Sequence, residues 1–570
     1  MELEQIKKLI EKYALQNAIK YNKAPNVGAV MGKVMGKHPE LRSKAKEIVP
    51  LVQSVLQEKH LGIDSREWKR KLEEIDPSLI EELSKTKEAK RGLPDLDGVG
   101  INEKVVMRFA PNPNGPPTLG SARGIIINHE YAKKYNGTFI LRFDDTDPLT
   151  KRPILKAYSW YLEDCKWLRS EPDKVYIASE RIPIYYEYAE KLIELNKAYV
   201  CFCKKEDFKT YKDAKKPCPH RNQSVEENME YWKNMLKGVY EEGEAVLRIK
   251  TDIEHKDPAL RDWGAFRIIK SVPHPRVGDK YIVYPLLDFE SAIEDHLLGI
   301  THIIRGKELM DSERRQKYIY EYFGWKYPKT IHWGRMKIHE FGKLSTSALS
   351  RDIDSGKYSG WDDPRLPTLR ALKKRGIQAD AIKKFMIELG VTETDISLSL
   401  KNMYAENKKI IDKEANRYFF VWNPILMPIK NAKPTIAKPP IHPDKKEYRE
   451  IKVDKKAVYV CKEDIDKLKI GDKIRLKDLY NIEIISKDPL QGKYIGRDLD
   501  IVKKEKMPII HWCPMEYLEV VVLGPDGNYD GIGEKGIAYA VDKVVQFERF
   551  GFVRVDSVAE DKVIAYFGHK

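Results

Sequence analysis

A short loop between a strand-like run and a helical pattern carries side chains suited to binding phosphate. The run Val105–Phe109 contains β-branched and aromatic residues, which is typical of a buried strand. Residues 110–119 contain four prolines and one glycine, so they cannot form a helix or a central strand. Thr118, Gly120 and Ser121 then stand where the helical pattern begins. Because the first turn of a helix offers unpaired N–H groups to an anion, this spacing predicts a phosphate-binding turn.

Two acidic residues follow the next predicted strand. The helical pattern that starts at Gly120 carries Ile125–Ile127, and residues 138–143 then form a strand-like run that ends at Asp144 and Asp145. In an open parallel sheet, nucleotides bind where a polar loop follows the carboxyl end of a strand. The segment therefore predicts a βαβ unit with a nucleotide site.

Three of the six cysteines lie within 18 positions and are followed closely by a histidine, the four residues being Cys201, Cys203, Cys218 and His220. Zn²⁺ takes four nitrogen or sulfur ligands in a tetrahedron, and two closely spaced pairs can supply them. Because the protein would fill all four positions, such a zinc would be structural and would leave no open position for catalysis. Free thiols that cluster by chance are the alternative, and a disulfide is less favoured in a reducing compartment.

The composition points to a large, basic protein. Its 570 residues exceed what one hydrophobic core supports, so several domains are expected. A net charge of +15 fits either a solvated surface or a polyanionic partner. Because 31 Tyr and 10 Trp accompany this charge, and aromatic faces stack on bases, a nucleic-acid partner is favoured. No apolar run approaches about 18 residues and the N-terminus lacks a signal-peptide pattern, so we expect a cytoplasmic protein without a membrane span.

Glycines recur at every fourth position near the N-terminus, at Gly28, Gly32 and Gly36. Residues 1 to about 90 otherwise show the helical spacing of apolar side chains. The stretch 26–36 could form a phosphate loop, but it lacks the Gly-Lys-Ser/Thr end of a P-loop. Close helix packing or an RNA-facing turn fits it better.

Four blocks of sequence resemble those of class I glutamyl- and glutaminyl-tRNA synthetases. Residues 108–123 resemble the first signature of this family, and residues 141–148 resemble its next block. Residues 299–306 and 360–368 match two further blocks in the family's order and spacing. The resemblance extends from about residue 100 to the C-terminus. It is strongest to the archaeal type of glutamyl-tRNA synthetase, whose anticodon-binding part is β-barrel as in the glutaminyl enzymes.

The resemblance implies a multidomain α/β protein built on a Rossmann-type class I synthetase core. The expected parts are an N-terminal helical appendage (1–98), two catalytic halves (99–200 and 300–355), an inserted acceptor-stem-binding domain with the zinc site (201–299), a helical connector (356–423) and anticodon-binding β-barrels (424–570). We expect a monomer. Tyr480, Tyr494 and Arg497 are candidate readers of anticodon bases, although buried strand aromatics look the same in sequence.

The implied activity is the ATP-dependent attachment of L-glutamate to tRNA(Glu). The α-carboxylate of glutamate attacks the α-phosphate of Mg²⁺-bound ATP, which gives glutamyl-adenylate and pyrophosphate. The terminal adenosine of the tRNA then takes the acyl group and AMP leaves. From the second family signature, the resemblance implies that Lys343 and Ser345 act on the triphosphate. The ATP-binding residues of the first signature are Pro111, Asn112, Pro113, Asn114, Gly115, Pro116, Pro117, Thr118, Leu119, Gly120 and Ser121.

The resemblance also implies a glutamate pocket made by Arg108, Asp144 and Arg305. The family uses an arginine at the first position for a substrate carboxylate and an aspartate at the second for the α-ammonium group. Arg305 is the residue expected to select glutamate, because glutaminyl enzymes carry a small uncharged residue there. A guanidinium group forms a bidentate pair with a γ-carboxylate.

Both signatures depart from the usual family pattern. The first signature usually has histidines where this chain has Thr118 and Ser121, and the second usually has a lysine where it has Thr346. Hydroxyl groups still donate hydrogen bonds to phosphate oxygens, but they bring no positive charge. We expect Lys343, the helix N-terminus and Mg²⁺ to supply that charge.

Two other functions remain open at this level. The altered signatures fit a catalytically silent tRNA-binding paralogue, although an inactive protein has no need of a glutamate pocket. A glutaminyl-tRNA synthetase is the second alternative. The resemblance also leaves open whether tRNA(Gln) is charged with glutamate as well.

Overall fold

The computed structural model describes residues 3–21, 25–58, 65–79, 92–100, 103–341 and 346–570. The chain forms two compact units, Met1–Pro94 and Asp95–Lys570. Among the described residues, no helix has both the length and the apolar character needed to cross a membrane.

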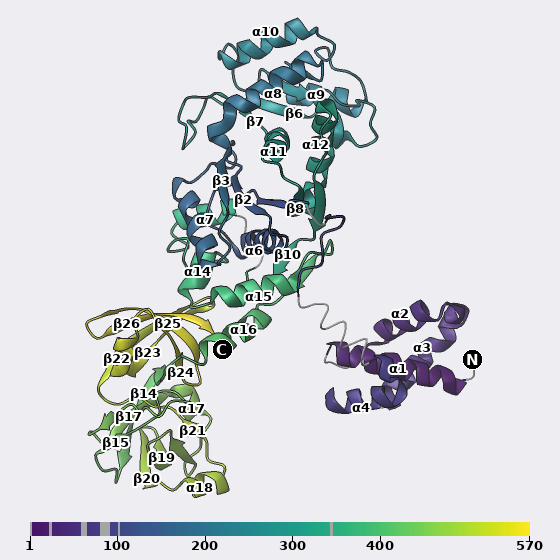
Figure 1. Ribbon diagram of the computed structural model, residues 1–570. Coiled ribbons are helices and arrows are strands. Elements are labelled where there is room, and N and C mark those ends of the chain that lie inside the picture. Colours follow the sequence, from purple (N-terminus) through teal and green to yellow (C-terminus); the bar gives the residue numbers. More distant parts are fainter. Residues whose placement is uncertain (1–2, 22–24, 59–64, 80–91, 101–102, 342–345) are drawn as a thin grey trace. The chain divides into compact units, whose positions relative to one another are not determined.

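The first unit is helical, as predicted. Its described α-helices are α1 (Leu3–Tyr21), α2 (Val27–Lys37), α3 (Ala45–Glu58) and α4 (Ser65–Ile75), drawn in purple in Figure 1. The glycine-spaced stretch 26–36 forms the N-cap of α2 and most of that helix, so the expectation of an RNA-facing turn is wrong. The glycines do not mediate close packing either, since a Cβ atom on Gly32 or Gly36 would meet nothing within 4 Å. This helix packs instead through the fully buried Val30 and Val34.

A five-stranded parallel sheet forms the core of the first part of the second unit. Its order is β3-β2-β1-β8-β9, with every neighbouring pair parallel. The chain runs outward from β1 in one direction and then returns to add β8 and β9 on the other side. The switch point of the sheet therefore lies between β1 and β8, which confirms the Rossmann-type prediction. The strands are β1 (Val106–Phe109), β2 (Thr138–Phe143), β3 (Lys174–Ile177), β8 (His302–Gly306) and β9 (Lys329–Trp333).

Helices cover this sheet and connect its strands. Helix α6 (Leu119–Lys134) packs on β1 and β2, as Figure 1 shows. Helix α7 (Leu155–Trp167) joins β2 to β3, and α12 (Met310–Phe323) joins β8 to β9. This arrangement places the carboxyl ends of β2, β1 and β8 side by side at one edge of the sheet.

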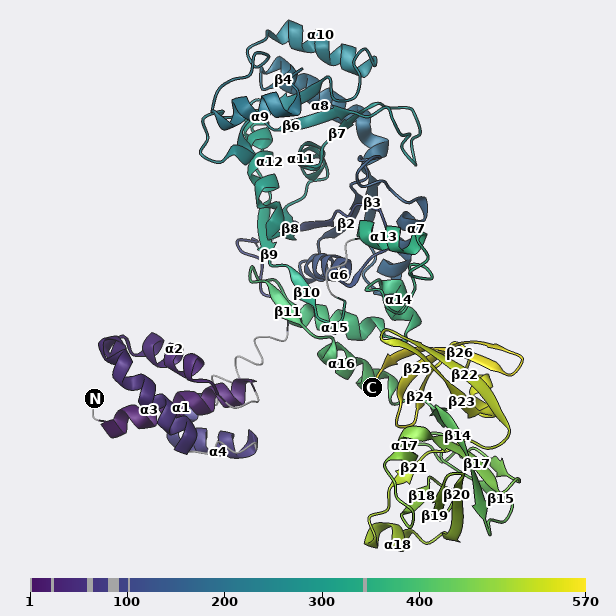
Figure 2. The ribbon, with the colours of Figure 1, turned by 180° about the vertical axis from the view of Figure 1, so that it is seen from behind.

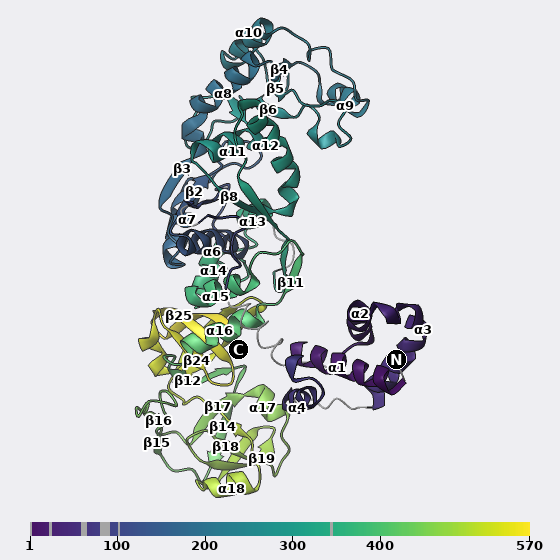
Figure 3. The same ribbon diagram turned by 45° about the vertical axis from the view of Figure 1, so that its right-hand side comes forward.

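An inserted domain interrupts the sheet between β3 and β8. It contains a four-stranded antiparallel sheet in the order β4-β5-β6-β7, surrounded by α8, α9 and α10 (Figure 3). Helix α11 follows β7 and leads back to the catalytic sheet. The bounds are α8 (Ile182–Glu194), β4 (Ala198–Cys201), α9 (Lys205–Asp213), α10 (Val225–Leu236), β5 (Val246–Ile249), β6 (Gly264–Ile268), β7 (Val283–Pro285) and α11 (Leu287–Leu297).

A mainly helical segment follows β9. The short parallel pair β10–β11 lies beside α15 (Figure 2). Arg375, at the end of α14, donates hydrogen bonds to the carbonyl groups of Phe567 and Gly568 and so ties this segment to the last strand of the chain. The bounds are β10 (Met336–Ile338), α13 (Thr346–Asp354), α14 (Leu369–Lys374), α15 (Ala379–Leu389), β11 (Ile396–Leu398) and α16 (Lys401–Ile411).

The C-terminal part is made of β-sheets, as predicted. A seven-stranded sheet has the order β12-β24-β25-β26-β22-β23-β13, and a six-stranded sheet has the order β17-β14-β20-β19-β18-β21. The strands of the first are β12 (Arg417–Tyr418), β13 (Phe420–Trp422), β22 (Tyr517–Gly524), β23 (Gly527–Glu534), β24 (Val544–Phe547), β25 (Gly551–Ala559) and β26 (Lys562–His569). Those of the second are β14 (Pro424–Lys430), β17 (Ala457–Cys461), β18 (Lys473–Leu476), β19 (Asn481–Lys487), β20 (Leu490–Gly496) and β21 (Ile509–Ile510).

The candidate anticodon readers differ in exposure. Tyr480 is 1% exposed and belongs to the core of the six-stranded sheet, so its ring cannot stack on an RNA base. Tyr494 is half-buried against Tyr480, with ring centroids 5.3 Å apart. Arg497 is exposed, and its guanidinium donates a hydrogen bond to Thr435.

Helix α6 lies so close to β1 that a glycine is required at their contact. A Cβ atom on Gly124 would lie 2.3 Å from Cε2 of Phe109. We expect Gly124→Ala to destabilise the protein by about 1–3 kcal/mol, because overpacking outweighs the gain of about 1 kcal/mol in helix propensity. Calorimetric melting temperatures test this, with Gly32→Ala as the matched control that should be neutral or stabilising. A Gly124→Ala protein that melts at or above the wild-type temperature would show that the contact relaxes freely.

Candidate active site

The loop that carries the first signature is fixed by backbone hydrogen bonds on two sides. The N–H of Asp144 donates to the carbonyl of Pro111 at 3.0 Å, and the Asn112 amide donates to the carbonyl of Asp144 at 2.9 Å. On the other side, the N–H of Leu119 donates to the carbonyl of Pro367 at 2.9 Å. The loop is therefore held between the end of β2 and the 360–368 block.

The turn that was predicted to bind phosphate forms the start of α6. Thr118 caps this helix, and its Oγ1 accepts a hydrogen bond from the N–H of Ser121 at 3.4 Å. Thr118 and Ser121 are half-buried, whereas Gly120 is exposed. The first turn of α6 thus presents a hydroxyl pair and a side-chain-free position at a helix N-terminus, where the helix dipole favours an anion.

The second signature is described only in part. Lys343 and Ser345 lie outside the described residues. Thr346 is the first residue of α13, and its Cγ2 would lie 2.4 Å from a Cβ atom placed on Gly115. The ring of Trp361 approaches the same position at 3.1 Å. Thr346 therefore packs against the first-signature loop, at the position where the family usually has lysine.

Three buried arginines converge at the carboxyl edge of the parallel sheet. Arg108, Arg142 and Arg305 are each the last residue but one of their strands, which are β1, β2 and β8. The sequence blocks identified the first and third of these. Arg142 stands in the second block and was missed, because an arginine on a strand gives no sign of the direction its side chain takes.

Two buried carboxylates balance these arginines. Arg142 pairs with both oxygens of Asp144, from Nε to Oδ1 at 2.6 Å and from Nη2 to Oδ2 at 3.2 Å. Asp295, which is 1% exposed on α11, accepts hydrogen bonds from Arg108 and Arg142. Burial alone would raise the pKa of Asp295, but the guanidinium groups of Arg108 and Arg142 outweigh burial and lower it to about 2. The carboxylate is therefore ionised at neutral pH.

Arg305 keeps unused hydrogen-bonding capacity. Its Nη1 donates to Oε1 of Gln316 at 3.1 Å, and its Nη2 lies 4.0 Å from Asp295. Its Nε is buried and has no hydrogen-bond partner among the described residues. Burial lowers the pKa of Arg305, and the positive charge of Arg108 acts in the same direction. An additional anion next to Arg305 would stabilise its charged form against both burial and the positive charge of Arg108.

A cavity of about 200 Å³ lies directly in front of these groups. This is below the roughly 300–1,000 Å³ of sites for drug-sized ligands and fits one small molecule. Arg108, Asp144 and Arg305 all line the cavity, so the structure brings the three predicted residues together. The other residues around it are Phe109, Ala110, Leu287, Ser291, Ile304, Gly306, Leu309, Ser312, Gln316 and Trp333.

The predicted metal ligands also come together. The Sγ atoms of Cys201 and Cys218 are 4.0 Å apart, and Sγ of Cys203 lies 3.4 Å from Nδ1 of His220. All four ligand atoms lie within 4.8 Å of one another. Tetrahedral zinc with Zn–S bonds of about 2.3 Å places its sulfur ligands roughly 3.8 Å apart, so the four donors fit that ion.

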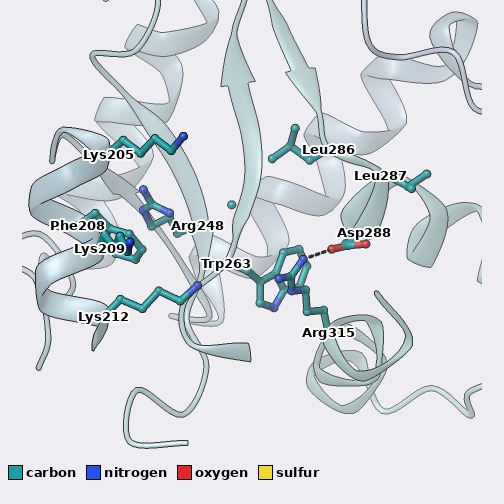
Figure 4. A pocket seen from close by; sticks show the side chains of 11 residues that line it. Lys205, Phe208, Lys209, Lys212, Arg248, Trp263, Leu286, Leu287, Asp288 and Arg315 are labelled. Carbon is teal, nitrogen blue, oxygen red and sulfur yellow. Dashed lines mark hydrogen bonds and ion pairs between the residues drawn. The ribbon is translucent and has the colours of Figure 1, made fainter. Parts of the chain in front are cut away.

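A basic groove of about 570 Å³ adjoins the metal-ligand cluster. Figure 4 shows the amines of Lys205 and Lys212 extending into it from α9, opposite Arg315 of α12. The guanidinium of Arg248 lies 3.4 Å from the ring centroid of Phe208. Motif analysis did not reveal this groove, because its residues come from five separate elements.

The groove carries more positive charge than its own residues neutralise. Its five basic residues are Lys205, Lys209, Lys212, Arg248 and Arg315, and its only carboxylate, Asp288, is paired with Arg315 at 2.7 Å. Burial lowers the pKa of Lys212, and the charges of Arg315 and Arg248 lower it further. Leu287 lines both the groove and the 200 Å³ cavity, so the two are neighbours.

Known proteins match the chain over its whole length. The family model "tRNA synthetases class I (E and Q), catalytic domain" matches residues 104–413, and two models of the anticodon-binding domain of the same family match residues 415–500 and 509–556. A glutamate–tRNA ligase of Methanosarcina barkeri is 61% identical over 99% of both chains. Those of Archaeoglobus fulgidus and Pyrococcus furiosus are 57% and 49% identical over 98% and 99% of this chain, and over the whole of each relative.

The parallel sheet, the C-terminal sheets and these matches all indicate the same family. The chain belongs to the class I tRNA synthetases of the glutamyl and glutaminyl (E and Q) family.

Proposed function

We propose that this protein is a glutamate–tRNA ligase, which activates L-glutamate with ATP and transfers it through glutamyl-adenylate to tRNA(Glu), releasing AMP and pyrophosphate. The observation that carries the proposal is the buried set of three arginines and two carboxylates around the 200 Å³ cavity. The curated relatives named glutamate–tRNA ligase, which match the full length of the chain, support it. As its tRNA and amino acid are cytoplasmic, we propose that location for the enzyme.

The charge balance of the pocket favours glutamate over glutamine. Arg108, Arg142 and Arg305 carry three positive charges, against two negative charges on Asp144 and Asp295, which leaves +1. L-glutamate carries a net charge of −1 and neutralises the pocket, whereas glutamine is neutral and leaves one guanidinium uncompensated. An uncompensated buried charge is costly, so the pocket discriminates against the amide. In this proposal the free donors of Arg305 bind the γ-carboxylate.

ATP binds at the start of α6. Thr118, Gly120 and Ser121 offer hydroxyl and backbone N–H donors to the phosphates, and Lys343 and Ser345 of the second signature contribute from the other side. Mg²⁺ arrives with the triphosphate and keeps several waters, so it requires no cage of protein ligands. Because little covalent work is asked of the protein, placement of the reactants and stabilisation of phosphate charge supply most of the rate.

Arg305→Gln tests the glutamate pocket. With tRNA present, the wild-type protein should exchange labelled pyrophosphate into ATP in response to glutamate and not to glutamine. The variant should lose about 100-fold in kcat/KM for glutamate, because a charge-assisted bidentate contact is removed. Arg314→Gln, a change on the surface of α12, is the control. Equal exchange with glutamine, or an unaffected variant, would contradict the proposal.

The two alternatives have less support. A catalytically silent paralogue has no use for a balanced, buried amino-acid pocket. A glutaminyl enzyme does not fit the charge of Arg305, and the curated relatives quoted above bear the glutamate name. Charging assays on purified tRNA(Glu) and tRNA(Gln) determine whether the second tRNA also receives glutamate.

We further propose that Cys201, Cys203, Cys218 and His220 hold a structural Zn²⁺. The metal would cross-link the end of β4 to the segment after α9. Because all four ligands come from the protein, it would take no part in the reaction.

Purified protein should then contain one zinc per chain by mass spectrometry of the metal content. Cys203→Ser should lower this content and reduce the melting temperature, because a structural zinc site contributes directly to folding free energy. Cys165→Ala, which removes a buried thiol outside the cluster, should leave the metal content unchanged. Zinc-supplied protein that retains no metal would refute the site.

The groove in Figure 4 is our candidate for contact with the single-stranded acceptor end of the tRNA. The unneutralised lysines that line the groove suit the phosphate backbone of a single strand. The groove also adjoins the pocket in which the glutamyl group would be activated.

Lys205→Glu/Lys209→Glu should raise the KM for tRNA about 10- to 100-fold and leave the KM for glutamate nearly unchanged. The slope of log KM against log salt should fall by about 1.4, since each lost contact to a single strand removes about 0.7. Lys215→Glu/Lys216→Glu, the same change of charge beyond the end of α9, is the matched control. Identical salt slopes in both variants would exclude the groove as an RNA contact.

A further inference from the structure

A single carboxylate on α11 connects arginines from three neighbouring strands. Asp295 comes from the helix that leads out of the inserted domain, whereas Arg108, Arg142 and Arg305 come from β1, β2 and β8. Because β2, β1 and β8 are adjacent in the sheet, their arginines emerge side by side. Three like charges in a buried place repel one another unless an opposite charge lies among them.

The hydrogen bonds of Asp295 fix two of the arginines in direction. Arg108 donates to it from Nε at 3.1 Å and from Nη2 at 3.2 Å, and Arg142 donates from Nη1 at 2.7 Å. Arg142 uses its remaining donors on Asp144 and Ser291. Arg108 is thereby held along one edge of its guanidinium, which leaves Nη1 for the cavity that the residue lines.

The carboxylate one residue earlier on the same helix, that of Glu294, has different hydrogen-bond partners. Glu294 is fully buried, and its Oε1 accepts hydrogen bonds from Arg181 and from the Tyr185 hydroxyl. None of these three residues lines the 200 Å³ cavity. Glu294 therefore joins α11 to α8 and its preceding turn, and Asp295 is the carboxylate of this pair that faces the pocket arginines.

We propose that Asp295 is the positioning residue of the amino-acid pocket: it orients Arg108 and Arg142 and keeps the pocket at a net charge of +1, matched to glutamate. The inference rests on the proposed glutamate pocket and adds a residue that does not itself line the cavity. Its two roles are separable. The orientation of the two arginines depends on the hydrogen bonds of the carboxylate. The match between the pocket and the charge of glutamate depends on the negative charge of the carboxylate.

Asp295→Asn removes the charge and one acceptor while keeping the shape. The amide can accept only at its oxygen, so it cannot serve all the donors that Asp295 now satisfies. The KM for glutamate should rise about 10- to 100-fold, while the KM for ATP should stay within about twofold. The pocket charge becomes +2, so a small anion should enter it. Chloride should then inhibit competitively against glutamate in this variant and not in the wild type.

Two further variants separate positioning from a general loss of structure. Glu294→Gln makes the same isosteric change one residue earlier, and its KM for glutamate should stay within about twofold even if its melting temperature falls. The double variant Arg142→Gln/Asp295→Asn returns the pocket charge to +1. Because it has no excess buried charge, it also serves as the test protein if Asp295→Asn alone fails to fold. Its KM for glutamate should remain raised, since Arg108 is still unheld, but the inhibition by chloride should disappear.

The measurement is pyrophosphate exchange with tRNA present, at constant ionic strength with chloride replaced stepwise by a bulky anion. The proposal is supported by three results together: a raised KM with chloride competition in Asp295→Asn, a raised KM without chloride competition in the double variant, and neither change in Glu294→Gln. A wild-type KM in folded Asp295→Asn, or an equal rise in Glu294→Gln, overturns it. If the wild-type enzyme itself does not respond to glutamate, the proposed function fails, which is a different result from either of these.

Discussion

The placement of three guanidinium groups at one buried edge of the sheet is the constraint on which the site depends. β-strands that end side by side can present these groups to a common point, but only if carboxylates offset their repulsion. Asp144 follows the end of β2, so the sheet supplies one carboxylate itself. Asp295 must come from outside the sheet, and α11 delivers it because the inserted domain returns to β8 through this helix. The insertion therefore contributes a residue to the proposed amino-acid pocket.

The same edge of the sheet connects the proposed amino-acid pocket to the turn that we propose binds ATP. Asp144, which pairs with Arg142, also binds the Pro111 carbonyl through its own N–H. Asn112 donates back to the Asp144 carbonyl. The proposed phosphate-binding turn and the proposed glutamate pocket are thus built on one hydrogen-bonded loop, which suits a reaction that joins a carboxylate to the α-phosphate.

Local sequence patterns were sufficient to predict the capped turn at the start of α6 and the proximity of the four candidate metal ligands. The turn follows from prolines, a helix cap and neighbouring strands, all within about thirty residues. The metal-ligand cluster depends on two short pairs, whose ligand atoms the structure brings within 4.8 Å. Arg108, Asp144 and Arg305 required the family blocks, because nothing local in a strand indicates that residues nearly 200 positions apart will line one cavity.

Contacts set by tertiary packing could not be predicted in this way. Asp295 lies in an ordinary helical pattern between an acidic residue and a histidine, and no spacing distinguishes it from Glu294. The basic groove is assembled from separate elements, so its lysines and arginines look like a solvated surface in sequence. The glycines of the first unit gave a misleading signal, since a four-residue glycine spacing is equally compatible with the exposed face of a helix.

The most direct test of the charge-matched pocket is a crystal structure of the protein with L-glutamate bound. We expect the γ-carboxylate to accept hydrogen bonds from Arg305 at about 2.8 Å, with Arg108 still held by Asp295. A γ-carboxylate bound elsewhere, with Arg305 still directed only at Gln316 and Asp295, would contradict the selection of glutamate by buried charge.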